Sequence, residues 1–321
     1  ARTQANWSHG QLNLTRFVTP AGSTVEISPD TRGAVIYRSV NGIGNVSYTG
    51  LQLQLNYGTT ITDNDRVEIC VFAVEMVHVN QGAFFAGDAS TNGTLRQFSQ
   101  GSTINPYQII SEALTGLGGT NVVNLCSRNN TSDDFDNVTL QTLPASFPKG
   151  FNAFYSMKYE ISMQQYCDFL NKLTATQAIN RFPNQNGVTG HTISNTGTAP
   201  DLYITSTPDR ACNFLSWADI CAYGDWAGLR PMTELEYEKA CRGLDAPLVD
   251  EAAWGLSSGC GAVNINNITN AGLPNETGSG LCIANGNYHS TLTNGVSSVA
   301  ARPLRCGFFA ASATNKTREE T

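Results

Sequence analysis

Apolar and polar residues alternate in four runs near the start of the chain, which is the pattern of half-buried β-strands. The runs are residues 12–17, 33–39, 50–57 and 66–73. Proline, glycine and asparagine separate them, and these residues are typical of tight turns. We therefore expect residues 1–73 to form an N-terminal β-sandwich-like module.

Helical patterns follow later in the chain. In three places a Ser or Thr is followed three positions on by Gln, Asp or Glu, which is the arrangement of a capping box at a helix start. The pairs are Ser162 with Gln165, Ser216 with Asp219, and Thr233 with Glu236. Apolar residues recur at helical spacing after each pair, so each pair is expected to begin an amphipathic helix.

Aromatic residues lie at helical spacing in the two later helices, which favours core packing over a sugar-stacking platform. They are Trp217, Tyr223, Trp226 and Tyr237. Two polar stretches, residues 89–146 and 180–207, are expected to be surface excursions. Short strands together with a few helices predict the α+β class.

The stretch from Pro208 to Gly243 resembles the formylglycine-generating enzyme, or sulfatase-modifying factor, family, whose fold is a variant of the C-type lectin fold. The matching residues are Ser216, Trp217, Asp219, Ala222, Tyr223, Trp226, Gly228, Arg230, Thr233, Glu234, Glu236, Glu238, Ala240, Arg242 and Gly243. A second stretch, Phe147–Thr174, resembles another run of the family. Its matches are Tyr155, Met157, Lys158, Tyr159, Glu160, Gln165, Tyr166, Phe169, Leu170 and Asn171.

The resemblance implies a formylglycine-generating-enzyme-like domain over residues 74–321 that lacks its C-terminal part. In the family, the segment that would follow Thr321 supplies central strands and two cysteines that bind copper(I) through soft thiolates. None of the cysteines present matches that context, so no catalytic or cofactor-binding residue is expected. Ala284-Asn285 resembles a pair at a structural calcium site of the family, so Asn285 is a candidate calcium ligand.

The chain has nine cysteines and no CxxC pair, which argues against zinc or iron–sulfur sites. Cys260 and Cys282 bracket a Gly/Asn-rich loop and are the best candidates for a disulfide. Cys167, Cys221 and Cys241 fall on expected helix faces and are expected to be small buried apolar residues.

Charged residues make up 14% of the chain and the net charge is −7. The absence of a basic run argues against nucleic acid and anionic membranes as partners. No apolar run reaches the ~18 residues that a membrane helix needs. N-glycosylation-type sequons recur at Asn6, Asn13, Asn45, Asn92, Asn129, Asn130, Asn137, Asn267, Asn275 and Asn315. Low charge and dense sequons favour an extracellular or cell-surface protein.

Three functions fit this sequence. The favoured one is a secreted, non-catalytic structural or interaction protein, a subunit of a surface assembly or filament that contacts further copies or other surface proteins. The reason is that incomplete sheets leave edges that pair with a neighbour. The alternatives are a fragment of a copper-dependent formylglycine-generating-type oxidase and a lectin-like ligand-binding module, with glycans as ligands.

Overall fold

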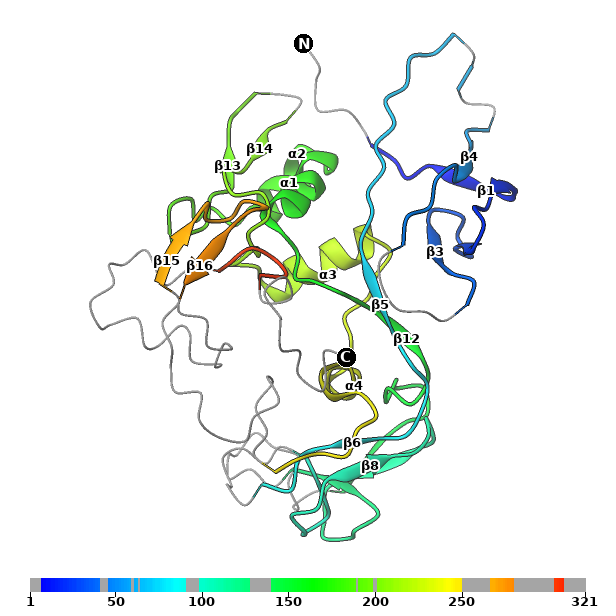
Figure 1. The fold of residues 1–321 in the computed structure, drawn as a ribbon, viewed down its shortest axis with the longest axis vertical. Coiled ribbons are helices and arrows are strands. Elements are labelled where there is room, and N and C mark those ends of the chain that lie inside the picture. The colour runs from blue at the N-terminus through cyan, green and yellow to red at the C-terminus, as the bar shows by residue number, and fades with distance from the viewer. Residues whose placement is uncertain are drawn as a thin grey trace.

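The computed structural model describes residues 7–40, 46–58, 61–62, 64–90, 98–127, 140–188, 190–198, 201–249, 266–279 and 303–308. Within these ranges the chain has few helices and many short strands (Figure 1). The helices are α1 (Met163–Lys172), α2 (Ala175–Arg181), α3 (Trp217–Trp226) and α4 (Glu234–Arg242). The strands are β1 (Gln11–Val18), β2 (Ser23–Ile27), β3 (Ala34–Arg38), β4 (Gln52–Asn56), β5 (Met76–Val79), β6 (Phe84–Ala86), β7 (Ser99–Gln100), β8 (Tyr107–Ile109), β9 (Thr115–Leu117), β10 (Leu125–Cys126), β11 (Gln141–Leu143), β12 (Phe154–Met157), β13 (Ser194–Asn195), β14 (Tyr203–Ile204), β15 (Asn266–Thr269) and β16 (Thr277–Ser279). The α+β prediction is thus confirmed at the level of a mixed fold.

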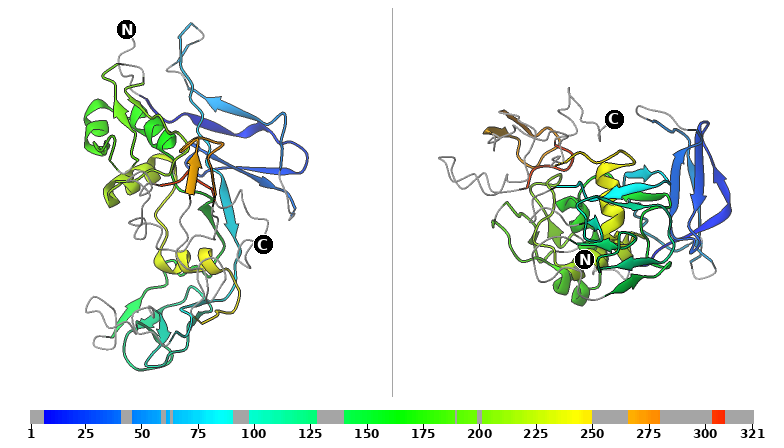
Figure 2. Two further views of the ribbon diagram at one scale, coloured as in Figure 1. Left: turned by 60° about the vertical axis from the view of Figure 1, so that its left-hand side comes forward. Right: turned by 90° about the horizontal axis from the view of Figure 1, so that it is seen from below.

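The N-terminal strands form two antiparallel pairs, β1 with β4 and β2 with β3, on one side of the molecule (Figures 1 and 2). Three of the four predicted strand runs are confirmed as β1, β3 and β4. The fourth prediction is wrong, because residues 66–73 belong to no sheet in the described part of the chain. β2 was not predicted, since only two residues of its run, Val25 and Ile27, are apolar.

A second group of strands follows the N-terminal pairs. β5 pairs with β12, β6 pairs with β8, and β7, β9, β10 and β11 form a four-stranded sheet. The prediction that residues 89–146 are a surface excursion is therefore wrong. Phe98, Ile109 and Leu125 from this region join Phe84 and Leu235 in a buried cluster. Strands of two or three residues are too short to show a period of two, so the polar composition hid them.

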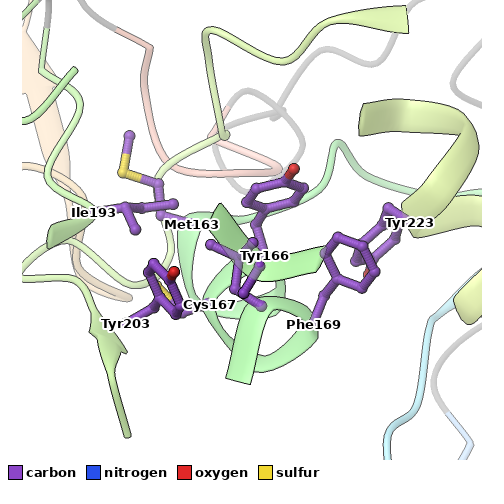
Figure 3. Close-up of a cluster of buried hydrophobic side chains, with 9 residues drawn as sticks. Met163, Tyr166, Cys167, Phe169, Ile193, Tyr203 and Tyr223 are labelled. Carbon is purple, nitrogen blue, oxygen red and sulfur yellow. The ribbon is translucent and has the colours of Figure 1, made fainter. Parts of the chain in front are cut away.

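The larger core forms around α1. The apolar face of α1 contributes Met163, Tyr166 and Phe169, which meet Tyr203 of β14 and Tyr223 of α3 (Figure 3). The ring centroids of Tyr166 and Phe169 are 5.4 Å apart, and those of Phe169 and Tyr223 are 5.7 Å apart. The predicted stripe on α1 is confirmed, whereas the stretch 180–207 also contributes buried side chains and is not a simple excursion.

All three predicted capping boxes are present, with both reciprocal hydrogen bonds formed in each. A fourth box joins Thr174 and Gln177 at the start of α2, a helix that the sequence interpretation missed. Gly243 ends α4 with φ 73°, in the left-handed region that favours glycine. Capping side chains satisfy backbone N–H groups that a helix start otherwise leaves unpaired.

The orientation of α3 differs from the prediction. Its buried residues are Asp219, Tyr223 and Gly224, while Trp217 is 68% exposed. Tyr237 on α4 is exposed as well. The expectation that all four aromatic residues pack in the core is therefore wrong for these two. Apolar residues on α3 occur on both faces, so periodicity alone could not choose the buried one.

A buried lysine of α4 fixes the loop between β11 and β12 to that helix, and a second buried lysine holds the loop together from within. Lys239 donates to the carbonyl oxygens of Gly150 and Phe151 at 2.6 and 3.2 Å. Lys149 donates to the carbonyl oxygen of Pro144 at 2.8 Å, with Phe147 and Glu112 as further acceptors. Burial lowers the pKa of both amines. Each charge is held by backbone dipoles, so α4 and the loop form one unit.

Glu236 is the capping carboxylate of α4, and its hydrogen bonds predict that the stability of the fold falls in acid. Its oxygens accept two hydrogen bonds from Arg230, at 2.8 and 2.6 Å, and one from the backbone N–H of Thr233. Burial alone would raise the pKa of Glu236, but these hydrogen bonds outweigh it and hold the pKa below the ordinary value of 4.5.

A carboxyl whose pKa is lower in the folded state stabilises the fold above pH 4.5, and that stability is lost as the pH falls through the folded pKa. Carboxyl groups titrate between about pH 6 and about pH 3. Over this range we expect the free energy of unfolding, measured with urea, to fall less steeply in Glu236→Gln than in the wild type. Glu234→Gln, at an exposed position of the same helix, is the control. Equal slopes for wild type and Glu236→Gln would contradict the assignment.

Candidate functional site

An open cavity of about 450 Å³ lies where three segments meet. The segments are the residues at and after the end of β12, the loop before α3, and α3 itself. The lining residues are Met157, Tyr159, Glu160, Ile161, Cys212, Asn213, Phe214, Leu215 and Ile220. The lining is largely apolar with few polar groups, which is typical of small-ligand sites.

The loop before α3 is held in place on both sides of the cavity. The backbone N–H of Cys212 donates to the carbonyl oxygen of Ile161 at 2.8 Å. Asn213 meets the Nδ1 atom of the fully buried His191 at 2.8 Å. The ring of His191 also contacts the ring of Phe214 edge-on, with centroids 5.8 Å apart. These contacts hold the loop in place beside the cavity.

Phe214 adopts a strained backbone conformation at the rim of the cavity. Its φ is 60°, in the left-handed region, and its side chain is 43% exposed. For a residue with a bulky side chain this conformation costs on the order of 1–2 kcal/mol. A strained residue that holds an aromatic ring in solvent at a cavity is a candidate for ligand contact.

Glu160 supplies the only carboxylate among the lining residues. It is exposed, and no ion pair or side-chain hydrogen bond joins it to the rest of the described chain. The neighbouring Lys158 instead pairs with Glu75 at 2.6 Å. The ammonium of Lys158 also lies 5.2 Å from the centroid of Tyr159. The cavity therefore combines apolar walls with one available negative charge.

The described thiols near the cavity are held in their protonated form. Burial, followed by the proximity of Cys306, raises the pKa of Cys212 to about 12. Burial also raises the pKa of Cys306 and of Cys167 to about 12. Because the thiolate is the nucleophile, none of these three is activated for nucleophilic chemistry.

The predictions for the three cysteines on helices have different outcomes. Cys167 is buried, as predicted, and Cys221 is partly buried. Cys241 is exposed, so its prediction as a buried apolar residue is wrong; its helix face is turned to solvent. All cysteines that the structure describes are free thiols. The predicted disulfide partners Cys260 and Cys282, and the candidate calcium ligand Asn285, lie outside the described residues.

The sequons are described in part. Asn13 lies on β1, where its Oδ1 accepts from the backbone N–H and the hydroxyl of Thr15 at 3.0 and 3.1 Å. Asn275 is exposed near β16. Asn267 lies in β15. Seven others lie outside the described residues: Asn6, Asn45, Asn92, Asn129, Asn130, Asn137 and Asn315. Glycosylation of all ten asparagines stays a prediction.

The described residues contain no cluster of three or more His, Cys, Asp or Glu side chains suited to hold a metal ion. None of the described helices is long and apolar enough to cross a membrane. The cavity, rather than a metal centre, is therefore the candidate site in this part of the chain.

Capped helices and short paired strands define a mixed α/β domain with one largely apolar cavity. Residues 70–278 match the model of the sulfatase-modifying factor enzyme 1-like domain. This match spans more than half of the chain, so the chain belongs to that family. No curated protein and no solved structure matches the chain.

Proposed function

We propose that the protein is a secreted, non-catalytic structural or interaction protein that assembles with further copies through residues 66–73, the contact segment. We further propose that the N-terminal strands form a β-sandwich-like module and that the family domain has the C-type-lectin-like fold. The exposed strand pattern of the contact segment, which belongs to no sheet in the described part of the chain, carries this proposal.

The contact segment has the sequence of a strand but the exposure of a loop. Val67, Ile69 and Val71 alternate along it, and they are 54%, 63% and 87% exposed. In an extended chain these three side chains point to one face, so they form an apolar ridge. Exposed extended stretches with β-branched side chains can form a strand pair with another chain.

The contact segment is attached to the domain at its C-terminal end. The ring of Phe72 meets that of Trp226 edge-on, with centroids 4.9 Å apart. β5 begins at Met76 and pairs with β12. The segment thus leads into a strand that is itself held by pairing (Figure 1). A segment anchored at one end loses less conformational entropy on pairing than a free chain end does.

The N-terminal pairs also present apolar residues to solvent. Leu14 and Val18 of β1 are exposed, as are Val35 and Ile36 of β3. Two separate two-stranded pairs are marginal by themselves. Burial of these side chains against a second copy favours the same assembly that the contact segment suggests.

The proposal predicts that self-association depends on the apolar ridge. Ile69→Lys/Val71→Lys is expected to be monomeric in light scattering and in electron micrographs at concentrations where the wild type forms oligomers or filaments. Charged side chains on a strand block edge pairing. Ile179→Lys, at an exposed apolar position of α2, is the matched control and is expected to assemble like the wild type.

A wild-type protein that stays monomeric at high concentration would rule out the assembly. The alternative, an oxidase, predicts turnover of a cysteine-containing peptide with added copper. Copper-dependent oxidation of such a peptide would therefore overturn the non-catalytic part of the proposal.

A further inference from the structure

We propose that the contact segment of one copy adds as a further strand to the free edge of β11 in the next copy, so that the assembly grows head to tail. This inference rests on the proposed self-association and names the surface that receives the contact segment. The receiving edge is defined as residues 140–143, which are Leu140 and β11. Three observations carry the inference: the position of β11 in its sheet, the uncharged surface around it, and the placement of the two elements in the molecule.

β11 lies at the end of a four-stranded sheet. The strand order is β11–β9–β10–β7, so in the described part of the chain β11 pairs with β9 on one side and with no strand on the other. An edge strand presents backbone N–H and C=O groups to a chain that can lie beside it. Residues 140–143 include no charged residue and no proline, which are the usual protection of an edge. The receiving edge can therefore accept another strand.

The pairing of β11 with β9 decides which side chains of the edge are exposed. Leu143 of β11 and Leu117 of β9 lie on the same face of the pair and pack against the buried cluster around Phe84. Side chains alternate along a strand, so Thr142 and Leu140 point to the outer face. Leu140 is 71% exposed. A contact segment whose apolar ridge faces outward as well buries Leu140 and its own valines together.

The part of the chain around β11 carries almost no charge. Among residues 98–127 and 140–149, the insertion lobe, the charged residues are Glu112 and Lys149. Lys149 is buried, and the carboxylate of Glu112 accepts from the backbone N–H groups of Lys149 and Asn152 at 2.6 and 3.0 Å. Two copies with a net charge of −7 repel each other, least where the facing surfaces are uncharged. The apolar ridge and the insertion lobe therefore match electrostatically.

The exposed side chains of the insertion lobe favour a protein neighbour over a lipid surface. The large apolar ones are Ile104, Ile110, Leu114, Val122, Val123 and Leu140. All of these are aliphatic, whereas surfaces that bind membranes combine aromatic with basic side chains. A strand offers backbone hydrogen bonds as well as apolar contact, so the contact segment fits the receiving edge better than lipid does.

The receiving edge and the contact segment lie in different parts of the molecule. The insertion lobe forms the lower end of the molecule in Figure 1, while the contact segment runs through the upper half toward β5 (Figures 1 and 2). A contact between two different surfaces of the same chain is heterologous, so it continues into rings or filaments and does not close as a two-fold dimer. The placement thus links strand addition to the growth of a filament.

Variants that block one surface at a time test this contact. Leu140→Lys/Thr142→Lys places charges at two exposed positions of the receiving edge. Its counterpart is the double-lysine variant of the contact segment described above. Ile179→Lys/Val188→Lys adds the same charge at exposed positions elsewhere and is the control. We expect light scattering to show both blocked variants as monomers at concentrations where the wild type and the control assemble.

A mixture of the two blocked variants distinguishes a head-to-tail contact from a symmetric one. The receiving-edge variant keeps an intact contact segment, and the contact-segment variant keeps an intact receiving edge. We expect the equimolar mixture to form a complex of two chains and nothing larger. In that complex the amides of residues 141–143 are expected to be protected from hydrogen exchange, a protection that the separate variants lack. A mixture that stays monomeric overturns the head-to-tail contact.

The other outcomes separate this inference from the proposed function. A wild type that stays monomeric overturns both. If the wild type assembles and Leu140→Lys/Thr142→Lys assembles equally well, the receiving edge is overturned while self-association through the contact segment stands. Flotation of the wild type with phosphatidylcholine vesicles, lost in the receiving-edge variant, assigns the insertion lobe to lipid and overturns the inference as well.

The melting temperature of the receiving-edge variant guards against a loss of folding. Both positions are exposed, so we expect it to equal that of the wild type. If it falls, the single variant Leu140→Lys replaces the double one, because Leu140 lies outside the paired residues of β11. A single variant that melts and assembles like the wild type overturns the inference.

Discussion

Lys239→Met is expected to lower the free energy of unfolding by about 3 kcal/mol, because a buried and a partly buried carbonyl oxygen lose their donor. Those oxygens belong to Gly150 and Phe151, and the Lys239 side chain is fully buried. Methionine keeps most of the volume, so the loss reports the hydrogen bonds rather than a cavity. Urea unfolding followed by circular dichroism measures the change.

Lys158→Met is the control for this prediction. Lys158 is partly exposed and pairs with the exposed Glu75, so its replacement is expected to cost less than about 1 kcal/mol. Equal losses for the two variants would show that the carbonyl contacts of Lys239 contribute little. In that case water or a shifted loop would satisfy Gly150 and Phe151.

Phe169→Ala is expected to destabilise the protein by about 4 kcal/mol, through lost burial and the cavity left in the larger core. Phe169 is 1% exposed, and its ring contacts those of Tyr166, Tyr223 and Trp226 at centroid distances of 5.4 to 5.7 Å. These contacts join α1 to α3. The same unfolding measurement gives the change in free energy.

The control for Phe169→Ala is Ile179→Ala. Ile179 lies exposed on α2, so its truncation is expected to change stability by less than about 0.5 kcal/mol. A loss below about 1 kcal/mol for Phe169→Ala would mean that the core around α1 collapses to fill the space, and the packing in Figure 3 would not be a main source of stability.

Local chemistry made the helix starts predictable. The three boxes at Ser162, Ser216 and Thr233 need only residues three positions apart, so sequence spacing and structure agree. The stripe on α1 was predictable for the same reason. Which face of α3 is buried depends on what packs against it, so the exposure of Trp217 was not predictable from its helix alone.

The sheets were harder to predict than the helices. β10 pairs with β7 and β9, and each of these strands has only two or three residues. Their pairing is set by contacts between distant parts of the chain, which alternation cannot reveal. The contact segment shows the opposite case, because its pattern is that of a strand although it belongs to no sheet in the described chain.

The cavity was not predicted at all. Glu160 and Phe214 belong to segments that matched the family or lay beside a match, and their residue types alone indicate no binding role. The left-handed backbone of Phe214 carries no sequence signal, since Gly or Asn would be the usual residue there. Convergence of three segments on one space is a property of the fold rather than of any motif.

The two exposed thiols among the described residues, Cys70 and Cys241, give the molecule an intrinsic footprinting pair. Cys70 lies inside the contact segment, and Cys241 lies on α4. Burial raises the pKa of Cys241, so it alkylates slowly but at a rate independent of the segment. If the protein self-associates as proposed, peptide mass mapping after iodoacetamide treatment will show Cys70 becoming shielded, with Cys241 as an internal reference and without any engineered label.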